Sequence, residues 1–324
     1  MDLLSTLRRL DEVQRRHTWL SFPIAVAKKF GDDRAGSHAA LIAYYGFFSM
    51  FPLLLALVTV LGIVLANDPV LRERIVDSAL SSFPVIGNQI RKNIRGIEAS
   101  GVMLALALGL AVWTGLGVIR TAQVAMDDVW DVPKGARPGF LPRTVRALLL
   151  LIVFGAGLTA SALLAGLSSS ESRFGAITQI IAFIATVALN GFLFTTAFRV
   201  LTTAEIRWRD VLPGGVIAAV GWALLQFLGT WLVQRQLAQA KEVYGFFFAV
   251  VIGLLSWIFI AAQLTLVAAE INVVRSRRLW PRSLMPPPHT GSDVEATTRE
   301  AKEEERPGQV VDVRFTGNDG EPRD

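Results

Sequence analysis

The chain has 324 residues, of which 52% are hydrophobic and only 18% are charged, and its mean hydropathy is +0.46. This apolar content exceeds what a soluble core of this size needs, so the composition favours a membrane protein over a soluble enzyme. The absence of cysteine excludes disulfides, thiolate nucleophiles and Cys-ligated metal sites. The net charge of +5 divides unevenly, because residues 289–324 hold ten acidic side chains against five basic ones.

Residues 1–38 carry too many charges for a secretory signal and predict a cytoplasmic amphipathic segment. Within residues 2–20, Leu3, Leu7 and Leu10 share one helical face, while arginines occupy most of the rest. This pattern indicates a helix that lies on the inner membrane surface.

Six uncharged segments follow, and each is long enough to cross about 30 Å of hydrocarbon as a helix. The predicted fold is therefore all-α, a polytopic membrane protein with six transmembrane helices and amphipathic interfacial helices. The membrane domain is predicted over residues 39–284, with spans at about 39–65, 101–119, 147–170, 174–198, 211–234 and 243–269.

The distribution of Lys and Arg between these spans predicts their orientation. With the N-terminus inside, the inner segments hold 19 basic residues and the outer segments hold 8. Both termini are therefore expected in the cytoplasm.

Two regions flank the predicted spans on either side of the membrane. The outer loop begins Asn67-Asp68-Pro69, which is typical of a helix start, and continues with an amphipathic pattern that predicts a second interfacial helix. Residues 285–324 begin with three prolines and have no apolar periodicity, so a disordered acidic cytoplasmic tail is expected.

Catalytic chemistry has little support in the sequence. The three histidines, His17, His38 and His289, lie outside the spans and far apart, and no hydrolase, phosphate-binding or dinucleotide motif occurs. We therefore expect no enzyme, no cofactor and no catalytic or metal-binding residue.

The one carboxylate cluster consists of Asp127, Asp128 and Asp131, which helical spacing would place within one turn of each other. Three such groups could hold a hard divalent cation. Solvated ion pairs with nearby arginines and lysines are the favoured interpretation.

Polar residues in or beside the spans are candidates for a transport path or for structural bonds. Glu270 ends an uncharged run of 27 residues and needs a cationic partner, for which Arg207, Arg209 and Arg275 are the nearest candidates under this topology. Pro52 is expected to kink the first span beside two tyrosines. The full set of candidates is Tyr44, Tyr45, Pro52, Arg207, Tyr244, Glu270 and Asn272.

Several strings resemble the YihY/BrkB family of bacterial inner-membrane proteins. They are AALIAYYGFFSMFPLLL at 39–55, RPGFLPRTVRALLLL at 137–151, IRWRDVLPGG at 206–215, VYGFFFAVVIGLLSWIF at 243–259 and LVAAEINVVRSRRLWPRSL at 266–284. The resemblance implies a six-span protein of the bacterial cytoplasmic (inner) membrane that is linked to envelope integrity. The family has also carried the label ribonuclease BN, for which this sequence offers no chemistry.

Three hypotheses about function follow. The first is a protein that transports or handles a lipid or another amphiphile. The alternatives are a non-transporting envelope-integrity protein that recruits partners, and a membrane-associated ribonuclease. Membrane lipids are the expected partners, with an amphiphile as the possible substrate and no nucleic acid, while substrate, direction, energy source and oligomeric state have no signal in the sequence.

Overall fold

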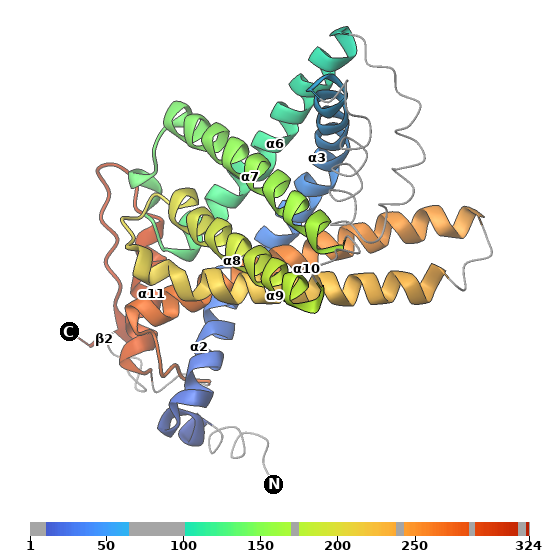
Figure 1. The fold of residues 1–324 in the computed structure, drawn as a ribbon. Helices are drawn as coiled ribbons and strands as arrows, with labels where there is room; N and C mark the ends of the chain where they lie inside the picture. The colour runs from blue at the N-terminus through green and yellow to red at the C-terminus, as the bar shows by residue number, and fades with distance from the viewer. Residues whose placement is uncertain are drawn as a thin grey trace.

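The computed structural model describes residues 11–64, 101–169, 175–237, 243–284, 289–316 and 322–323 (Figure 1). Nearly all of these residues are helical. The elements are α2 (Thr18–Asp32), α3 (Ala35–Val64), α6 (Gly101–Val129), the 3-10 turn η1 (Lys134–Ala136), α7 (Phe140–Ser169), α8 (Gly175–Leu201), α9 (Trp208–Leu237), α10 (Val243–Arg277), α11 (Gly291–Glu303), β1 (Phe315–Thr316) and β2 (Pro322–Arg323).

Among the described residues, five helices are long and apolar enough to cross a membrane. These are α6, α7, α8, α9 and α10, which correspond to the predicted second to sixth spans. α3 coincides with the predicted first span, and because only its first half is described in full, its crossing of the membrane stays a prediction.

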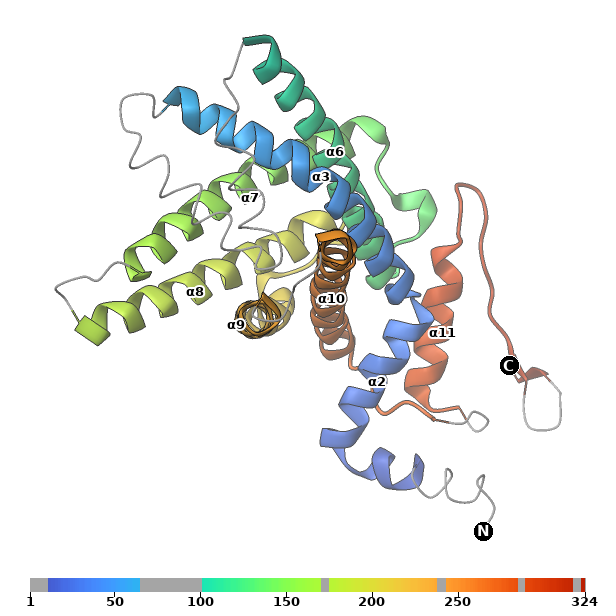
Figure 2. The same ribbon diagram turned by 90° about the vertical axis from the view of Figure 1, so that its right-hand side faces the viewer.

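The long helices pack in a chain of neighbours. α3 packs against α6 and α10, α9 lies between α8 and α10, and α7 packs against α8. Figure 2 looks along α9 and α10, with α3 and α6 side by side and α7 and α8 extending away from them. Large apolar side chains on α7, α8 and α9 stay exposed, as is expected of helices that face lipid.

The sequence Pro213-Gly214-Gly215 lets α9 fit closely between α8 and α10. A Cβ atom on Gly214 would lie 2.2 Å from the Ala268 carbonyl oxygen, and one on Gly215 would lie 2.0 Å from Thr195 Oγ1. Only glycine fits at such a close approach of two backbones. The two glycines at the end of the IRWRDVLPGG string are therefore required by the close packing of α9 against α8 and α10.

Asn272, one of the predicted polar residues, fixes the same contact between α9 and α10. Its Oδ1 accepts a hydrogen bond from the Gly214 N–H (2.7 Å), and its Nδ2 donates to the Val211 carbonyl (3.2 Å). Asn272 is fully buried, so both bonds are made away from water. We conclude that this side chain joins the two helices.

One end of the bundle gathers most of the charged side chains that are buried among the described residues, and we call it the charged end. It comprises the connections within residues 120–146, 199–210 and 270–284, together with α2 and the start of α3. The main hydrophobic core lies directly beneath, around Phe198, Leu266 and Val273. These are the segments predicted to share one side of the membrane; the assignment of that side to the cytoplasm stays a prediction.

The prediction of a disordered tail is wrong for residues 291–303, which form α11. Thr290 and Asp293 make a capping box that starts this helix, and Asp293 is buried. Its carboxylate accepts bonds from the Ser283 N–H (2.8 Å) and from Lys28 Nζ (3.2 Å). Residues 291–303 are ordered because their charges pair with opposite charges of the charged end. Hydrophobic periodicity in the sequence gives no signal for contacts of this kind.

The described part of the N-terminal segment, from residue 11 onward, packs on protein. The predicted apolar face formed by Leu3, Leu7 and Leu10 lies outside the described residues. Residues 11–16 are helical, and Gln14 Nε2 donates to the Arg282 carbonyl (2.7 Å) while Asp11 Oδ1 accepts from the Leu284 N–H (2.8 Å). α2 continues this segment and packs against α10. The outer interfacial helix predicted within residues 66–100 lies outside the described residues.

The described part of the chain departs from an all-α structure at one place. β1 and β2 form a two-stranded antiparallel pair, with Phe315 opposite Arg323. Each strand has two residues, so the pair adds little to the fold.

Candidate functional site

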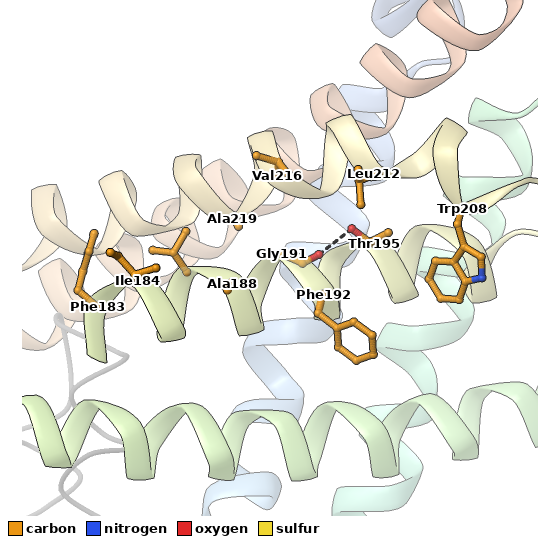
Figure 3. Close-up of a pocket in the computed structure, with 11 residues that line it drawn as sticks. Phe183, Ile184, Ala188, Gly191, Phe192, Thr195, Trp208, Leu212, Val216 and Ala219 are labelled. Carbon is orange, nitrogen blue, oxygen red and sulfur yellow. Dashed lines mark hydrogen bonds between the residues drawn. The ribbon is translucent and has the colours of Figure 1, made fainter. Parts of the chain in front are cut away.

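An apolar groove of about 610 Å³ runs between α8 and α9 (Figure 3). Its walls come from one face of each helix. The lining residues are Phe183, Ile184, Val187, Ala188, Gly191, Phe192 and Thr195 from α8, and Trp208, Leu212, Val216 and Ala219 from α9. The volume is in the range of sites that hold a small apolar ligand or part of a lipid chain.

Small residues create this groove. Ala188, Gly191 and Ala219 line its middle, where larger side chains would fill the space between the two helices. The hydroxyl of Thr195 donates to the Gly191 carbonyl (2.7 Å), so it is satisfied within α8. The groove wall therefore presents a continuous apolar surface.

The groove ends at a basic site. Trp208 lines the groove, and the Arg199 guanidinium stacks over its indole ring at 4.4 Å from the centroid. A second, polar pocket of about 440 Å³ adjoins there, lined by Arg199 and Arg207 together with one carboxylate, Glu205. The apolar groove thus ends near two guanidinium groups at the charged end.

Among the predicted site residues whose side chains the structure describes, Arg207 alone lies at this end, where it lines the polar pocket and not the groove itself. Its side chain is exposed, and its N–H donates to Asp210 Oδ2 (3.3 Å). We name the set formed by Arg199, Arg207 and Trp208 the basic end of the groove.

The predicted tyrosine site on α3 lies elsewhere. Tyr44 and Tyr45 are 55% and 42% exposed, and their rings meet edge to face with centroids 5.5 Å apart. They do not line the α8–α9 groove. Pro52 lies within α3, which continues through it as a helix. The side chain of Tyr244 lies outside the described residues.

The predicted partners of Glu270 are wrong. Glu270 is fully buried, and the charges that act most strongly on it belong to Lys29, Asp33 and Asp131. No described ion pair joins it to Arg207, Arg209 or Arg275. The reason is that α2 packs against α10 and brings its own charged residues to Glu270, a contact that the span topology did not include.

The three clustered carboxylates separate into different networks. Asp127 is fully buried and bonds Arg143 Nη2 (3.0 Å) and the Thr203 N–H (2.7 Å). Asp128 pairs with Arg137 (2.7 Å), whereas Asp131 turns toward α2. Each carboxylate has a cationic partner, and in the part of the chain that the structure describes no group of three His, Asp or Glu could hold a metal ion.

The charged end also perturbs the acids of the tail. Burial and the nearby charge of Asp128 raise the pKa of Glu303 to about 7, against the opposing effect of Arg137. Asp293 shows the opposite shift. Burial would raise its pKa, but the N–H bonds from Thr290 and Ser283 outweigh this and hold the pKa at about 2.

Sequence reasoning missed Arg199 and Trp208, which flank the connection between α8 and α9. A signal was present: Arg199 is the first charge after one apolar segment, and Trp208 begins the next helix. Arg and Trp at such boundaries are typical of membrane interfaces. The groove itself had no signal, because small residues are common at helix contacts in membranes.

Comparison with known proteins shows a family. The profile described as Virulence factor BrkB matches residues 26–290. The chain is 23% identical to the inner membrane protein YhjD of Escherichia coli (strain K12) over 286 residues, which cover 82% of this chain and 84% of YhjD. It is 22% identical to the ribonuclease-like protein YfkH of Bacillus subtilis (strain 168), covering 80% of this chain and 96% of YfkH.

A third relative is longer than this chain. The UPF0761 membrane protein of Saccharophagus degradans is 26% identical over 238 residues, which are 71% of this chain and 54% of that protein. No solved structure matches the chain. Because the family profile covers most of the chain and the helices suit a multi-pass protein, the chain is an integral inner-membrane protein of the BrkB family.

Proposed function

We propose that the chain binds an anionic amphiphile, of the class of phospholipids, in the α8–α9 groove and moves it within the inner membrane. The observation that carries this proposal is the apolar groove of about 610 Å³ whose end is closed by the stacked pair of Arg199 and Trp208. An acyl chain matches the groove wall, and an anionic headgroup matches the two guanidinium groups.

Charge decides which amphiphile this site favours. A basic residue near a membrane surface attracts anionic lipid by about 1 kcal/mol. Of the residues that line the polar pocket at the basic end, two are arginines, Arg199 and Arg207, and one is a carboxylate, Glu205. The Asp210 carboxylate beside this pocket accepts a bond from the Arg207 backbone N–H. Arg199 is also preorganised, because the Trp208 ring holds its guanidinium plane. Lipids with a phosphate headgroup and net negative charge are therefore favoured over zwitterionic lipids.

Topology gives the site a place in the membrane. We propose six spans, including α3, with both termini in the cytoplasm. The charged end then faces the cytoplasm, and the basic end of the groove lies at the headgroup level of the inner leaflet. The sequence has no nucleotide-binding motif, so we propose that movement of the lipid is passive, driven by a gradient or powered by a partner protein.

The binding step can be tested with the full chain in detergent, using native mass spectrometry against phosphatidylglycerol and phosphatidylcholine. We expect Arg199→Gln with Arg207→Gln to weaken phosphatidylglycerol binding about tenfold. Ala188→Trp should block the groove for both lipids. Arg275→Gln is the matched control, because Arg275 is exposed and does not line the groove. Equal binding of both lipids by all variants would exclude this site.

Movement requires a separate assay. Proteoliposomes with a fluorescent phosphatidylglycerol should show leaflet exchange that is slower with Ala188→Trp than with the wild-type chain. Binding without exchange would favour the alternative of a non-transporting envelope protein that holds lipid in place.

A further inference from the structure

Five charged side chains meet where α2 crosses α10, and we call them the α2–α10 cluster. They are Lys29, Asp33, Asp131, Glu270 and Arg277. Lys29 Nζ bonds Asp33 Oδ2 (2.6 Å) and Asp131 Oδ1 (3.1 Å), and Arg277 pairs with Asp131 Oδ2. The side chains of Lys29, Asp33 and Asp131 are each only 4% exposed, so water screens these charges little.

Glu270 is the member of the cluster that has no bond. It is fully buried, and neither of its carboxyl oxygens has a hydrogen-bond partner among the described residues. Three of its neighbours along α10, Ala268, Ala269 and Val273, are also fully buried. An ionised carboxylate in such a place would cost several kcal/mol.

The charges of the cluster do not balance. Three carboxyl groups face two cations, and both cations are already bonded to Asp33 or Asp131. One proton would bring the buried cluster to neutrality. The carboxyl groups that act on each other most directly are those of Glu270 and Asp33. Two carboxyl groups can hydrogen bond to one another only when one of them carries a proton.

We propose that Glu270 and Asp33 form a buried site for one exchangeable proton at the crossing of α2 and α10. The proton lies between the two carboxyl groups, and its release leaves one uncompensated negative charge between the helices. The site does not depend on the lipid-binding proposal, because neither residue lines the α8–α9 groove.

The charged surroundings favour exchange in the physiological range. Burial raises the pKa of Asp33 to about 6, with a further contribution from Asp131 and against the effect of Lys29. The charged groups that face the cluster are Lys29 from α2, Asp131 from the end of α6 and Arg277 from α10. From α11, Glu300 acts on Lys29 and Asp131, and Arg299 and Glu295 act on Arg277. Within the cluster, both described cations, Lys29 and Arg277, are already paired with a carboxylate. Neither is therefore free to neutralise Glu270 in place of the proton.

Infrared difference spectroscopy of the full chain in lipid nanodiscs tests this proposal. All spectra are taken in a Glu303→Gln background, because Glu303 has a pKa of about 7 and would add a band of its own. Between about pH 5 and about pH 8, this otherwise wild-type protein should lose one carbonyl band of a buried protonated carboxylic acid. Glu270→Gln and Asp33→Asn should each abolish the band. Glu300→Gln, which changes a carboxyl group outside the pair, should leave it in place.

Asp131→Asn tests whether the cluster holds its proton because of its charge balance or only because Glu270 is buried. This variant leaves two carboxyl groups against two cations, so the proton is no longer needed and the band should disappear although Glu270 is intact. The proposal is overturned by a wild-type spectrum without the band, by a band that does not change with pH, or by a band that persists in Glu270→Gln. A melting curve of each variant shows whether it is folded. If Glu270→Gln does not fold, the Asp131→Asn variant still tests the proposal.

Discussion

The charged end and the α8–α9 groove stabilise the molecule in different ways. The charged end buries ionisable groups, and Asp127 and Glu270 are both fully buried there above a hydrophobic core. The groove face buries little, and Ile184 and Phe227 on its helices are 60% and 72% exposed. Lipid solvates the second surface, so exposed apolar side chains carry no cost there. The difference shows that packing is concentrated where the chain leaves the hydrocarbon.

This difference also separates the two proposals. A surface that lipid solvates can exchange one lipid for another without unfolding, which suits the groove. A buried cluster with unbalanced charge responds to a proton by changing the contact between α2 and α10. The two sites share no residue, so each can be altered alone.

The largest contrast is expected from a pair of leucines. Leu266 is fully buried in the core beneath the charged end, whereas Leu212 lines the groove and is 55% exposed. Leu266→Ala should lower the free energy of unfolding by about 3 kcal/mol. Leu212→Ala should lower it by less than about 1 kcal/mol, because little protein contact is lost. Reversible unfolding in mixed micelles measures both values, and equal losses would contradict the comparison.

A smaller effect is expected from the ion pairs that hold the tail. Arg282 is buried and bonds Asp32 (2.6 Å) and Asp293 (3.2 Å). Arg282→Met should lower the free energy of unfolding by about 2 kcal/mol. This is less than the loss of a lone buried ion pair would cost, because Asp293 keeps its bonds from Ser283 and Lys28. Arg299→Met is the control, since Arg299 forms an exposed pair with Glu295 within α11 and should cost about 0.5 kcal/mol at most. Melting temperatures that fall equally in both variants would show that burial does not matter here.

The sequence predicted the apolar parts of the fold better than the charged parts. Spans two to six were recognised because uncharged runs of sufficient length predict helices. The helices extend past those runs, as α6 does from the predicted end at residue 119 to Val129, because the charged residues that follow remain helical and pair with other segments. Charge therefore marked the end of the predicted span but not the end of the helix.

The missed features depend on contacts between distant segments. The capping box of Thr290 and Asp293 is a sequence signal that could have predicted α11, and the polar composition of the tail concealed it. The environment of Glu270 had no such signal, because Lys29 and Asp33 lie more than 230 residues away in sequence. The predicted kink at Pro52 beside Tyr44 and Tyr45 lies on α3, whereas the groove lies between α8 and α9.

The smallest predicted effect concerns the docking of α11 at the charged end. Arg137 Nη2 bridges Asp128 Oδ1 (2.7 Å) and Glu303 Oε1 (2.8 Å), so the two carboxyl groups share one cation. Burial and the charge of Asp128 raise the pKa of Glu303 to about 7. In an undocked tail the pKa would return to the ordinary value of 4.5. The docked state therefore gains stability from this proton below about pH 4.5, and the gain is lost as the pH rises through about 7. Asp293 does not contribute over this range, because its pKa is about 2.

Hydrogen exchange of the α11 amides measures this docking. The two pKa values set an upper limit of about 70-fold on the change in protection between about pH 5 and about pH 8. Because Glu303 is partly exposed and solvent screens its charge, we expect protection, corrected for the intrinsic exchange rate, to fall only a fewfold in the wild-type chain. Glu303→Gln should remove most of the pH dependence, because the neutral amide imitates the protonated acid. Glu295→Gln is the control, since Glu295 is an exposed acid of the same helix. His38 Nε2 also lies 2.8 Å from Asp128 Oδ2, so each variant is compared in a His38→Gln background. If the pH dependence of protection survives in Glu303→Gln, another group controls the docking of α11.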